Sequence, residues 1–300
     1  ALPRGPAWQR RVPYPSVLVL LPHARRREMD RHHQSPIERL TRTFLLGQEG
    51  LPGVWREAQQ GLCLSGGADS CALAIVACAA LEKAPDRFPG GIAAYHVRHG
   101  LRGSESEGDA ASVRELCGRL GLALAELDAP IGPGSGLEAR AREARYHRLR
   151  QAAGPGTLLV TAHHLEDQAE TVMLRLLRGA GVVGLRGIHP LRSDGVWRPF
   201  LGASRQELSS VCRDIGWAPR EDSSNIDTSF ERNNLRHRLL PALEAESPGF
   251  SQALASLGSS AQHLGSHLES AIGRLESSLR FQLDPLGFSL DLSGYSATGP

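Results

Sequence analysis

The chain of 300 residues is 41% hydrophobic and 22% charged, values typical of a globular protein with one large or two modest domains. Its formal net charge is only +2, so the overall charge gives no argument for nucleic-acid binding, and any basic footprint must be local. No early apolar run approaches the roughly 20 residues that a membrane-spanning helix needs, and the run at 17–21 is also short for a signal-peptide core.

The five cysteines do not follow metal-binding or disulfide patterns. None belongs to a C-x-x-C pair; they are Cys63, Cys71, Cys78, Cys117 and Cys212. This spacing argues against a zinc site, an iron–sulfur cluster or a disulfide framework. It fits a reducing compartment, and we therefore expect a cytoplasmic protein.

Composition also suggests how the chain is divided. Residues 1–50 are rich in arginine and proline with weak periodicity, which predicts a basic, poorly ordered N-terminal extension. A basic arm that contacts RNA is the alternative reading of this segment. We expect a catalytic domain at 51–245, followed at 246–300 by a helical C-terminal linker or small domain.

The most informative stretch, from Leu62 to Ser70, has the pattern of a strand, a glycine turn and the start of a helix. Glycines let the backbone turn sharply, and the free N–H groups at a helix start make a seat for an anion, most often phosphate. Hydroxyls and amides here can cradle a pyrophosphate, with Asp69 holding Mg²⁺ beside it. The predicted phosphate-binding residues are Ser65, Gly66, Gly67, Ala68, Asp69 and Ser70. An ordinary tight turn is the alternative.

Beyond this loop, expected strands alternate with expected helices. Apolar strands at 92–97, 122–127 and 157–162 are separated by helical stretches that include 113–120, 137–153 and 167–177. We therefore predict an α/β fold, a Rossmann-like parallel sheet with helices on both faces. Ligands bind such sheets outside the carboxyl ends of the strands, where the loops at 65–70, 98–104 and 163–168 should gather.

The second of these loops, His96 to Arg102, holds two histidines three residues apart with no third ligand nearby. This favours structural histidines over a metal site. Arg98 and Arg102 can meet phosphate or ribose.

The third loop, His163 to Thr171, follows a strand and opens a helix. Asp167 and Glu170 are three residues apart and therefore share a helix face. Acids in a first turn also suit the helix dipole, which is the simpler explanation. Two acids and two histidines at a strand end are more than capping requires, and such carboxylates would hold an amine substrate or Mg²⁺.

The C-terminal part is helical and locally basic. Arginines and a histidine crowd the stretch 232–238, where Arg232 and Arg236 share a helix face. Either this is a solvated basic face or it contacts the phosphates of a polyanion. From Phe250 to Leu279 apolar residues recur every three or four positions, which predicts one long amphipathic helix.

Taken together, these motifs resemble the tRNA(Ile)-lysidine synthetases, a family within the PP-loop (N-type) ATP pyrophosphatases. The resemblance runs from about residue 60 to 245 and includes five segments in the family's order: 65–70, 96–102, 137–146, 163–171 and 222–241. Residues 163–171 resemble the family's H-H-x-D-D-Q-x-E-T motif, and the last two segments are the most specific.

The resemblance implies that the protein uses ATP to adenylate the C2 oxygen of cytidine 34 in the CAU anticodon of an isoleucine tRNA. The ε-amine of L-lysine then displaces AMP and forms lysidine. Residues 65–70 would hold ATP, with Asp69 near Mg²⁺. Asp69, Asp167 and Arg142 would be catalytic, and Asp167 and Glu170 would bind lysine. The implied tRNA contacts are Arg205, Arg232, Arg236 and His237.

Two residues depart from the family pattern. Arg98 stands where the family has asparagine, and Glu166 where it usually has aspartate. The intact Asp167 predicts an active enzyme. The alternatives are another PP-loop tRNA-modifying enzyme, such as a thiolase, or a degenerate tRNA-binding module without catalysis. The sequence leaves the oligomeric state open, a homodimer included.

Overall fold

The computed structural model describes residues 35–98, 104–130, 137–220, 231–278, 280–284 and 287–291. The strands are β1 (Gln60–Leu64), β2 (Ile92–Arg98), β3 (Leu124–Asp128), β4 (Leu158–Val160), β5 (Leu191–Arg192), β6 (Val196–Trp197), β7 (Arg280–Asp284) and β8 (Gly287–Asp291). The longer helices are α2 (Pro36–Glu49), α4 (Ala68–Lys83), α5 (Ser104–Leu120), α6 (Leu137–Ala153), α7 (Leu165–Leu177), α8 (Arg205–Asp214) and α11 (Phe250–Ser278). The short ones are α3 (Gly53–Arg56), η3 (Pro85–Arg87), η4 (Val182–Leu185), α9 (Glu231–Asn234), η6 (Leu235–Leu239, a π-helix) and α10 (Leu240–Glu246).

The central sheet has the strand order β3-β2-β1-β4-β6-β5, and every neighbouring pair is parallel except β5 with β6. Strands β1, β2 and β4 are short, apolar and largely buried, as expected for strands that are covered on both faces. The predicted Rossmann-like parallel sheet is therefore confirmed. Its parallel strands all end at one edge, where the phosphate-loop candidate follows β1 and the acidic loop follows β4.

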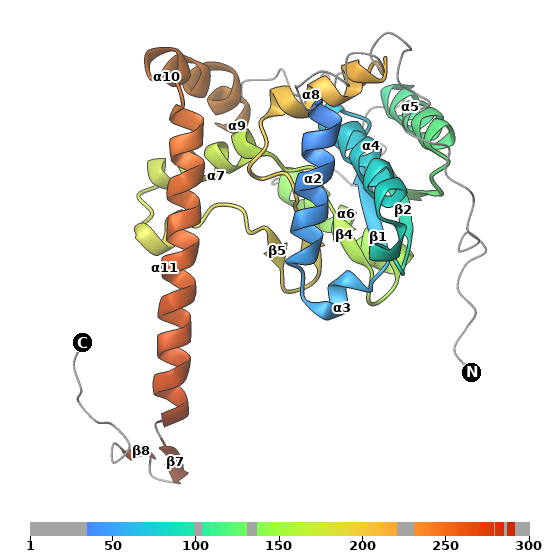
Figure 1. Cartoon of the computed structure of the whole chain (residues 1–300). Coiled ribbons are helices and arrows are strands. Elements are labelled where there is room, and N and C mark those ends of the chain that lie inside the picture. The colour runs from blue at the N-terminus through green and yellow to red at the C-terminus, as the bar shows by residue number, and fades with distance from the viewer. Residues whose placement is uncertain are drawn as a thin grey trace, which may run out of the picture.

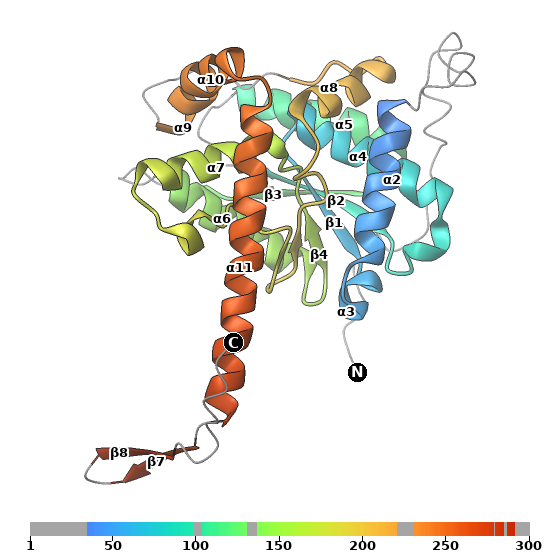
Figure 2. The same cartoon turned by 60° about the vertical axis from the view of Figure 1, so that its left-hand side comes forward.

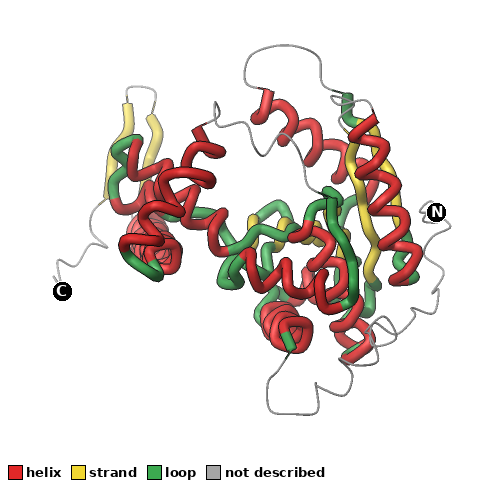
Figure 3. The backbone as a smooth tube through the Cα atoms, turned by 90° about the horizontal axis from the view of Figure 1, so that it is seen from above, coloured by secondary structure: helices red, strands yellow, loops and turns green. Residues whose placement is uncertain are grey.

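The two faces of the sheet bury different helices. On one face, Leu62, Val160 and Trp197 join a core with α2, α4, α5 and α8. On the other face, Tyr95, Leu159 and Val196 pack against α6. Figure 3 shows helices on either side of the strands. Because side chains alternate along a strand, these two sets fix which face each residue at a strand end lies on.

Helix α2 corrects the prediction for residues 1–50. Ser35 caps this helix in a reciprocal capping box with Glu38, and Phe44 is fully buried. The ring centroid of Phe44 lies 4.8 Å from that of Trp197 at the end of β6. In Figure 1, α2 runs beside α4 over the sheet. Residues 36–49 are therefore part of the folded body, and residues 1–34 lie outside the described range.

A second core joins α7 to the C-terminal helices. Ala169 and Val172 of α7 pack with Leu235, Leu240 and Leu254, so the packing is continuous across the domain boundary expected at residue 245. Helix α11 then extends away from the sheet and ends near the β7–β8 hairpin (Figures 1 and 2). Its predicted span, 250–279, agrees with the observed helix. Within the described part of the chain, no helix is both long and apolar enough to cross a membrane.

Candidate functional site

The loop between β1 and α4 is held in shape by its own residues. Gly66 has a φ of +94°, a conformation that favours glycine because any Cβ would be strained. The buried hydroxyl of Ser70 accepts hydrogen bonds from the backbone N–H groups of Ser65 (3.1 Å) and Gly66 (3.2 Å). It also donates to the carbonyl oxygen of Gly67 (3.0 Å). Of the predicted phosphate-binding residues, Ser70 is thus the one that braces the turn.

The start of α4 is open to an anion. Its N-cap residue is Gly67, and no side chain caps the helix. The first N–H groups of a helix lack intrahelical partners, and together with the positive end of the dipole they favour a phosphate. Among the described residues, no group of three or more histidine, cysteine, aspartate or glutamate side chains is placed so that it could hold a metal ion by itself. Mg²⁺ in nucleotide sites, however, commonly takes one or two carboxylates and completes its shell with phosphate oxygens and waters.

Asp69 fits that requirement. Its Oδ1 atom is buried and has no hydrogen-bond partner in the described structure. A buried carboxylate oxygen without a partner is costly, and coordination of a cation would satisfy it. Its other oxygen, Oδ2, lies 3.5 Å from Nε2 of His164. The first turn of α4 is thereby connected to the loop that follows β4.

His164 is the bridge between the two loops. It is 2% exposed, and its Nδ1 lies 2.9 Å from Oε2 of Glu166, while its Nε2 lies 3.5 Å from both Asp69 and Asp167. Burial disfavours the charged imidazole, but the surrounding carboxylates outweigh it and raise the pKa of His164 to about 10. At neutral pH an imidazolium therefore joins three acids. Sequence reasoning noted this histidine without giving it that role.

Glu166 and Arg98, the two departures from the family pattern, both take part in structural contacts. Oε2 of Glu166 accepts the backbone N–H of Arg205 (2.9 Å) and so ties α7 to the start of α8, and the side chain of Arg205 is exposed. Arg98 pairs with Asp128 (3.0 Å) and Glu107 (3.4 Å). The nearby His96 is buried and bonds through Nδ1 to the carbonyl oxygen of Leu64 (2.9 Å), which agrees with a structural histidine. His99 and Arg102 lie outside the described residues.

The predicted acids on α7 lie side by side, but their partners are the predicted tRNA-binding arginines. Glu170 is 0% exposed; its Oε2 accepts Nε of Arg232 (2.8 Å), and its Oε1 accepts Nε of Arg236 (2.6 Å). Oδ1 of Asp167 accepts the Nη2 atoms of Arg236 (3.0 Å) and Arg232 (3.3 Å). The pKa of Asp167 is lowered, because the charges of His164, His163 and the two arginines outweigh its burial. We call these four residues the acid–arginine network.

The network corrects the picture of a basic face on α9 and η6. Arg232 and Arg236 turn inward to the acids of α7, with side chains 28% and 19% exposed, instead of lying open to a polyanion. His237, on the same segment, is exposed. Arg142 lies on α6, exposed, with its guanidinium 5.7 Å from the ring centroid of Tyr146.

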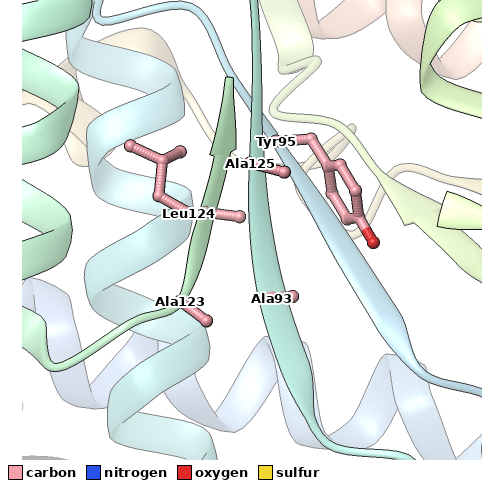
Figure 4. A pocket seen from close by; sticks show the side chains of 6 residues that line it. Ala93, Tyr95, Ala123, Leu124 and Ala125 are labelled. Carbon is pink, nitrogen blue, oxygen red and sulfur yellow. The ribbon is translucent and has the colours of Figure 1, made fainter. Parts of the chain in front are cut away.

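Hollows lie near the sheet in the described part of the chain. One is an apolar void of about 10 Å³ between β2 and β3 (Figure 4). It holds at most about one water molecule and is therefore no substrate site. The second, about 470 Å³, opens at the end of β3 beside α6 and is lined by Asp128, Ala129, Pro130, Ala144, His147 and Arg148. It lies at the same edge of the sheet as the phosphate loop and is large enough for a small ligand.

Two relatives match about two thirds of the chain. A tRNA(Ile)-lysidine synthase of Symbiobacterium thermophilum is 43% identical over 194 residues, which are 61% of this chain and 39% of the relative. That of Solibacter usitatus is 39% identical over 204 residues, 66% of this chain and 44% of the relative. The chain thus spans well under half the length of these two relatives.

A solved structure shares the fold. A U34-tRNA thiolase of Methanococcus maripaludis superposes with a TM-score of 0.58 at 18% identity, over 77% of this chain and 80% of that one. At this identity the likeness establishes the fold alone. The family model described as "PP-loop domain" matches residues 36–243, a range that begins with α2 and contains both the phosphate loop and the acid–arginine network. The chain therefore belongs to the PP-loop family.

Proposed function

We propose that this protein joins L-lysine to C2 of cytidine 34 in an isoleucine tRNA with a CAU anticodon, at the expense of ATP. The observation that carries the proposal is the contact of Asp69 and Asp167 with one buried imidazolium, His164. It places the phosphate loop next to a pair of acids. An anion seat suits the phosphates of ATP and a neighbouring carboxylate suits an amine, so both features fit an adenylation followed by attack of an amine.

The phosphate loop supports the first step. In it, the C2 oxygen of cytidine attacks the α-phosphorus of ATP, pyrophosphate leaves, and an adenylated tRNA forms. Backbone N–H groups at the start of α4 are placed to stabilise the departing pyrophosphate, and Asp69 would hold a Mg²⁺ ion, which would supply positive charge beside it. Arg142, at the same edge of the sheet, adds positive charge near the reacting phosphate.

The acid–arginine network supports the second step. Free lysine carries two ammonium groups and one carboxylate at neutral pH. Asp167 and Glu170 carry the charge that suits the ammonium groups, and the guanidinium groups of Arg232 and Arg236, which now bond to these acids, carry the charge that suits the carboxylate. The network thus offers both positive and negative groups to an amino acid. When the amino acid binds, ion pairs within the network are replaced by ion pairs with the ligand. The ε-ammonium group first gives up a proton to solvent. The ε-amine then attacks C2, and AMP leaves with the electrons of the C2–O bond.

The cysteines give no support to the thiolase alternative. Burial raises the pKa of Cys63 to about 12 and that of Cys71 to about 11, so these thiols stay protonated at neutral pH. A thiol in that state is a poor nucleophile and a poor carrier of sulfur. The reaction on tRNA also supports the cytoplasm as the location.

The test is lysine incorporation. The protein is incubated with ATP, Mg²⁺, radiolabelled lysine and an isoleucine tRNA transcript, beside a transcript in which cytidine 34 is replaced by uridine. We expect label only in the cytidine transcript and none with Asp167→Asn. AMP release that depends on a nucleophile other than lysine would refute the lysine assignment. Tight tRNA binding without AMP release would favour the non-catalytic binding module.

A further inference from the structure

A cluster of arginines surrounds Tyr146 on the α6 side of the sheet. The guanidinium carbon of Arg192 lies 5.1 Å from the ring centroid of Tyr146, and that of Arg142 lies 5.7 Å from it. Arg198 follows β6 and hydrogen-bonds to the side chain of Tyr146. We call Arg142, Arg192, Arg198 and Tyr146 the arginine–tyrosine cluster. Because Val196 faces α6, the alternation along β6 places Arg198 on that same side.

The base of this cluster is a buried cation. Arg198 is 3% exposed; its Nη1 donates to the carbonyl oxygen of His189 (2.5 Å), while its Nε has no hydrogen-bond partner in the described structure. Burial lowers the pKa of Arg198, and the positive charges of Arg142 and Arg192 lower it further. His163 is affected in the same way: burial and the neighbouring arginines lower its pKa to about 4, against the opposing pull of Asp167.

The cluster is short of negative charge. Within the described ranges, the carboxylate that forms an ion pair with one of these arginines is Asp194, 2.8 Å from Nη2 of Arg192, and both side chains are well exposed. Such exposed pairs contribute little, typically ~0.2–1 kcal/mol. The guanidinium groups of Arg142 and Arg192 lie over one aromatic ring, with the buried cation of Arg198 bonded to that tyrosine, and are therefore available to an anion that comes from outside the chain.

The position of the cluster identifies that anion. Strand β6 lies two places from β1 in the sheet, so Arg198 is displaced by about 10 Å from the phosphate loop, at ~4.8 Å per strand. A free nucleotide whose phosphates occupy the loop needs no second phosphate seat at that distance. A polynucleotide carries a phosphate at every residue. A cytidine that reacts beside the phosphate loop therefore brings flanking phosphates with it.

We propose that Arg142 and Arg192 bind a backbone phosphate next to the modified base, and that Arg198 positions Tyr146, on which the two guanidinium groups rest. The inference depends on the proposed function, since it takes the second substrate to be RNA. Contact with a phosphate positions the substrate without reading its sequence. We therefore expect the cluster to contribute equally to the binding of RNAs with cytidine or uridine at position 34.

The test measures binding without turnover. A fluorescent anticodon stem-loop RNA is titrated with the full chain over a series of salt concentrations, and the variants are Arg142→Gln, Arg192→Gln and Arg198→Lys. The control is Arg87→Gln, since Arg87 pairs with Glu49 at the far end of α4, at the opposite edge of the sheet. Removal of one phosphate contact should weaken binding about tenfold and reduce the slope of log K against log salt by about 0.7.

The binding of ATP alone to each variant separates the two sources of phosphate. Unchanged ATP affinity with weakened RNA binding by Arg192→Gln supports the proposal, whereas Arg142→Gln, which in the proposed function also lies near the reacting phosphate of ATP, is compared for RNA binding alone. Weakened ATP affinity with unchanged RNA binding would assign the cluster to the nucleotide and overturn the proposal. Normal RNA binding by both variants would also overturn the proposal.

Arg198→Lys keeps the positive charge but loses the planar guanidinium group, so it should weaken RNA binding while the melting temperature stays close to that of the wild type. Normal RNA binding by folded Arg198→Lys would refute the positioning role. Lysine incorporation by the wild-type protein is a separate readout, and its failure would count against the proposed function instead.

Discussion

Replacement of Glu170 by glutamine tests the acid–arginine network most directly. The side chain is 0% exposed, and both of its oxygens accept hydrogen bonds from Arg232 and Arg236. Glu170→Gln keeps the size of the side chain but removes its charge and turns an NH₂ group toward a guanidinium. The neutral glutamine then lies against the guanidinium groups of Arg232 and Arg236 and no longer neutralises their charge.

The structure sets the expected magnitude. Removal of one partner of a fully buried ion pair costs about 3–5 kcal/mol. The side chains of Arg232 and Arg236 keep 28% and 19% exposure, and Asp167 still pairs with both, so water and this acid recover part of the loss. We therefore expect the free energy of unfolding to fall by about 2–3 kcal/mol, which is less than the loss for a fully buried pair because the arginines are partly exposed.

The assay is urea unfolding, followed by circular dichroism, of wild type, Glu170→Gln, Arg236→Met and the double variant. The matched control is Glu246→Gln on α10, an exposed acid that should shift stability by less than about 0.5 kcal/mol. The two changes break the same ion pair. The free energy of unfolding lost by the double variant should therefore be at least about 1 kcal/mol smaller than the sum of the losses of the two single variants. Additive losses, or a loss of under about 0.5 kcal/mol for Glu170→Gln, would refute the reasoning.

Three further predictions follow from other parts of the structure. Gly66→Ala, at a φ of +94°, should lower the free energy of unfolding by about 1–2 kcal/mol and weaken ATP binding. Gly67→Ala, at a φ of −75°, should lower the free energy of unfolding less. Urea unfolding compares the two variants, and equal losses would contradict the strained turn. In the same assay, Phe44→Ala should lower the free energy of unfolding by about 3–5 kcal/mol. Leu46→Ala, on the exposed side of α2, should lower it by under about 1 kcal/mol. A small loss for Phe44→Ala would contradict the packing of α2 in the core. The pKa of His163 in the folded state lies below its unfolded value, so its contribution to stability is present above pH 6.5 and is lost as the pH falls toward about 4. When the free energy of unfolding is measured against pH, His163→Gln should flatten this part of the profile. An unchanged profile would show that His163 does not titrate there.

Local patterns were enough to predict the sheet and two of its loops. A strand, a glycine turn and a helix start are consecutive in sequence, so Leu62 to Ser70 could be placed without knowledge of the fold. The acids Asp167 and Glu170 were predicted to be neighbours because three residues separate them on a helix, and the structure agrees.

What the sequence did not reveal depends on contacts between distant segments. Arg232 reaches Glu170 across 62 positions and Arg236 reaches Asp167 across 69, and no helical periodicity encodes such a pairing. Helix α2 was hidden by the arginine-rich composition around it. A local signal did exist, since Ser35 and Glu38 have capping-box spacing and Ile37, Leu40 and Phe44 share one face.

The length of α11 fixes the direction in which the helix ends. Its contacts with the body extend at least to the ion pair of Arg186 with Glu269, and the helix continues to Ser278. At ~1.5 Å per residue, the nine residues from 270 to 278 add about 14 Å to the helix beyond that ion pair. Insertion of one residue there would lengthen the helix by about 1.5 Å and turn its end by about 100° around the helix axis. A change of whole turns in this part of α11 would therefore preserve the direction in which the helix ends, and a change of single residues would not.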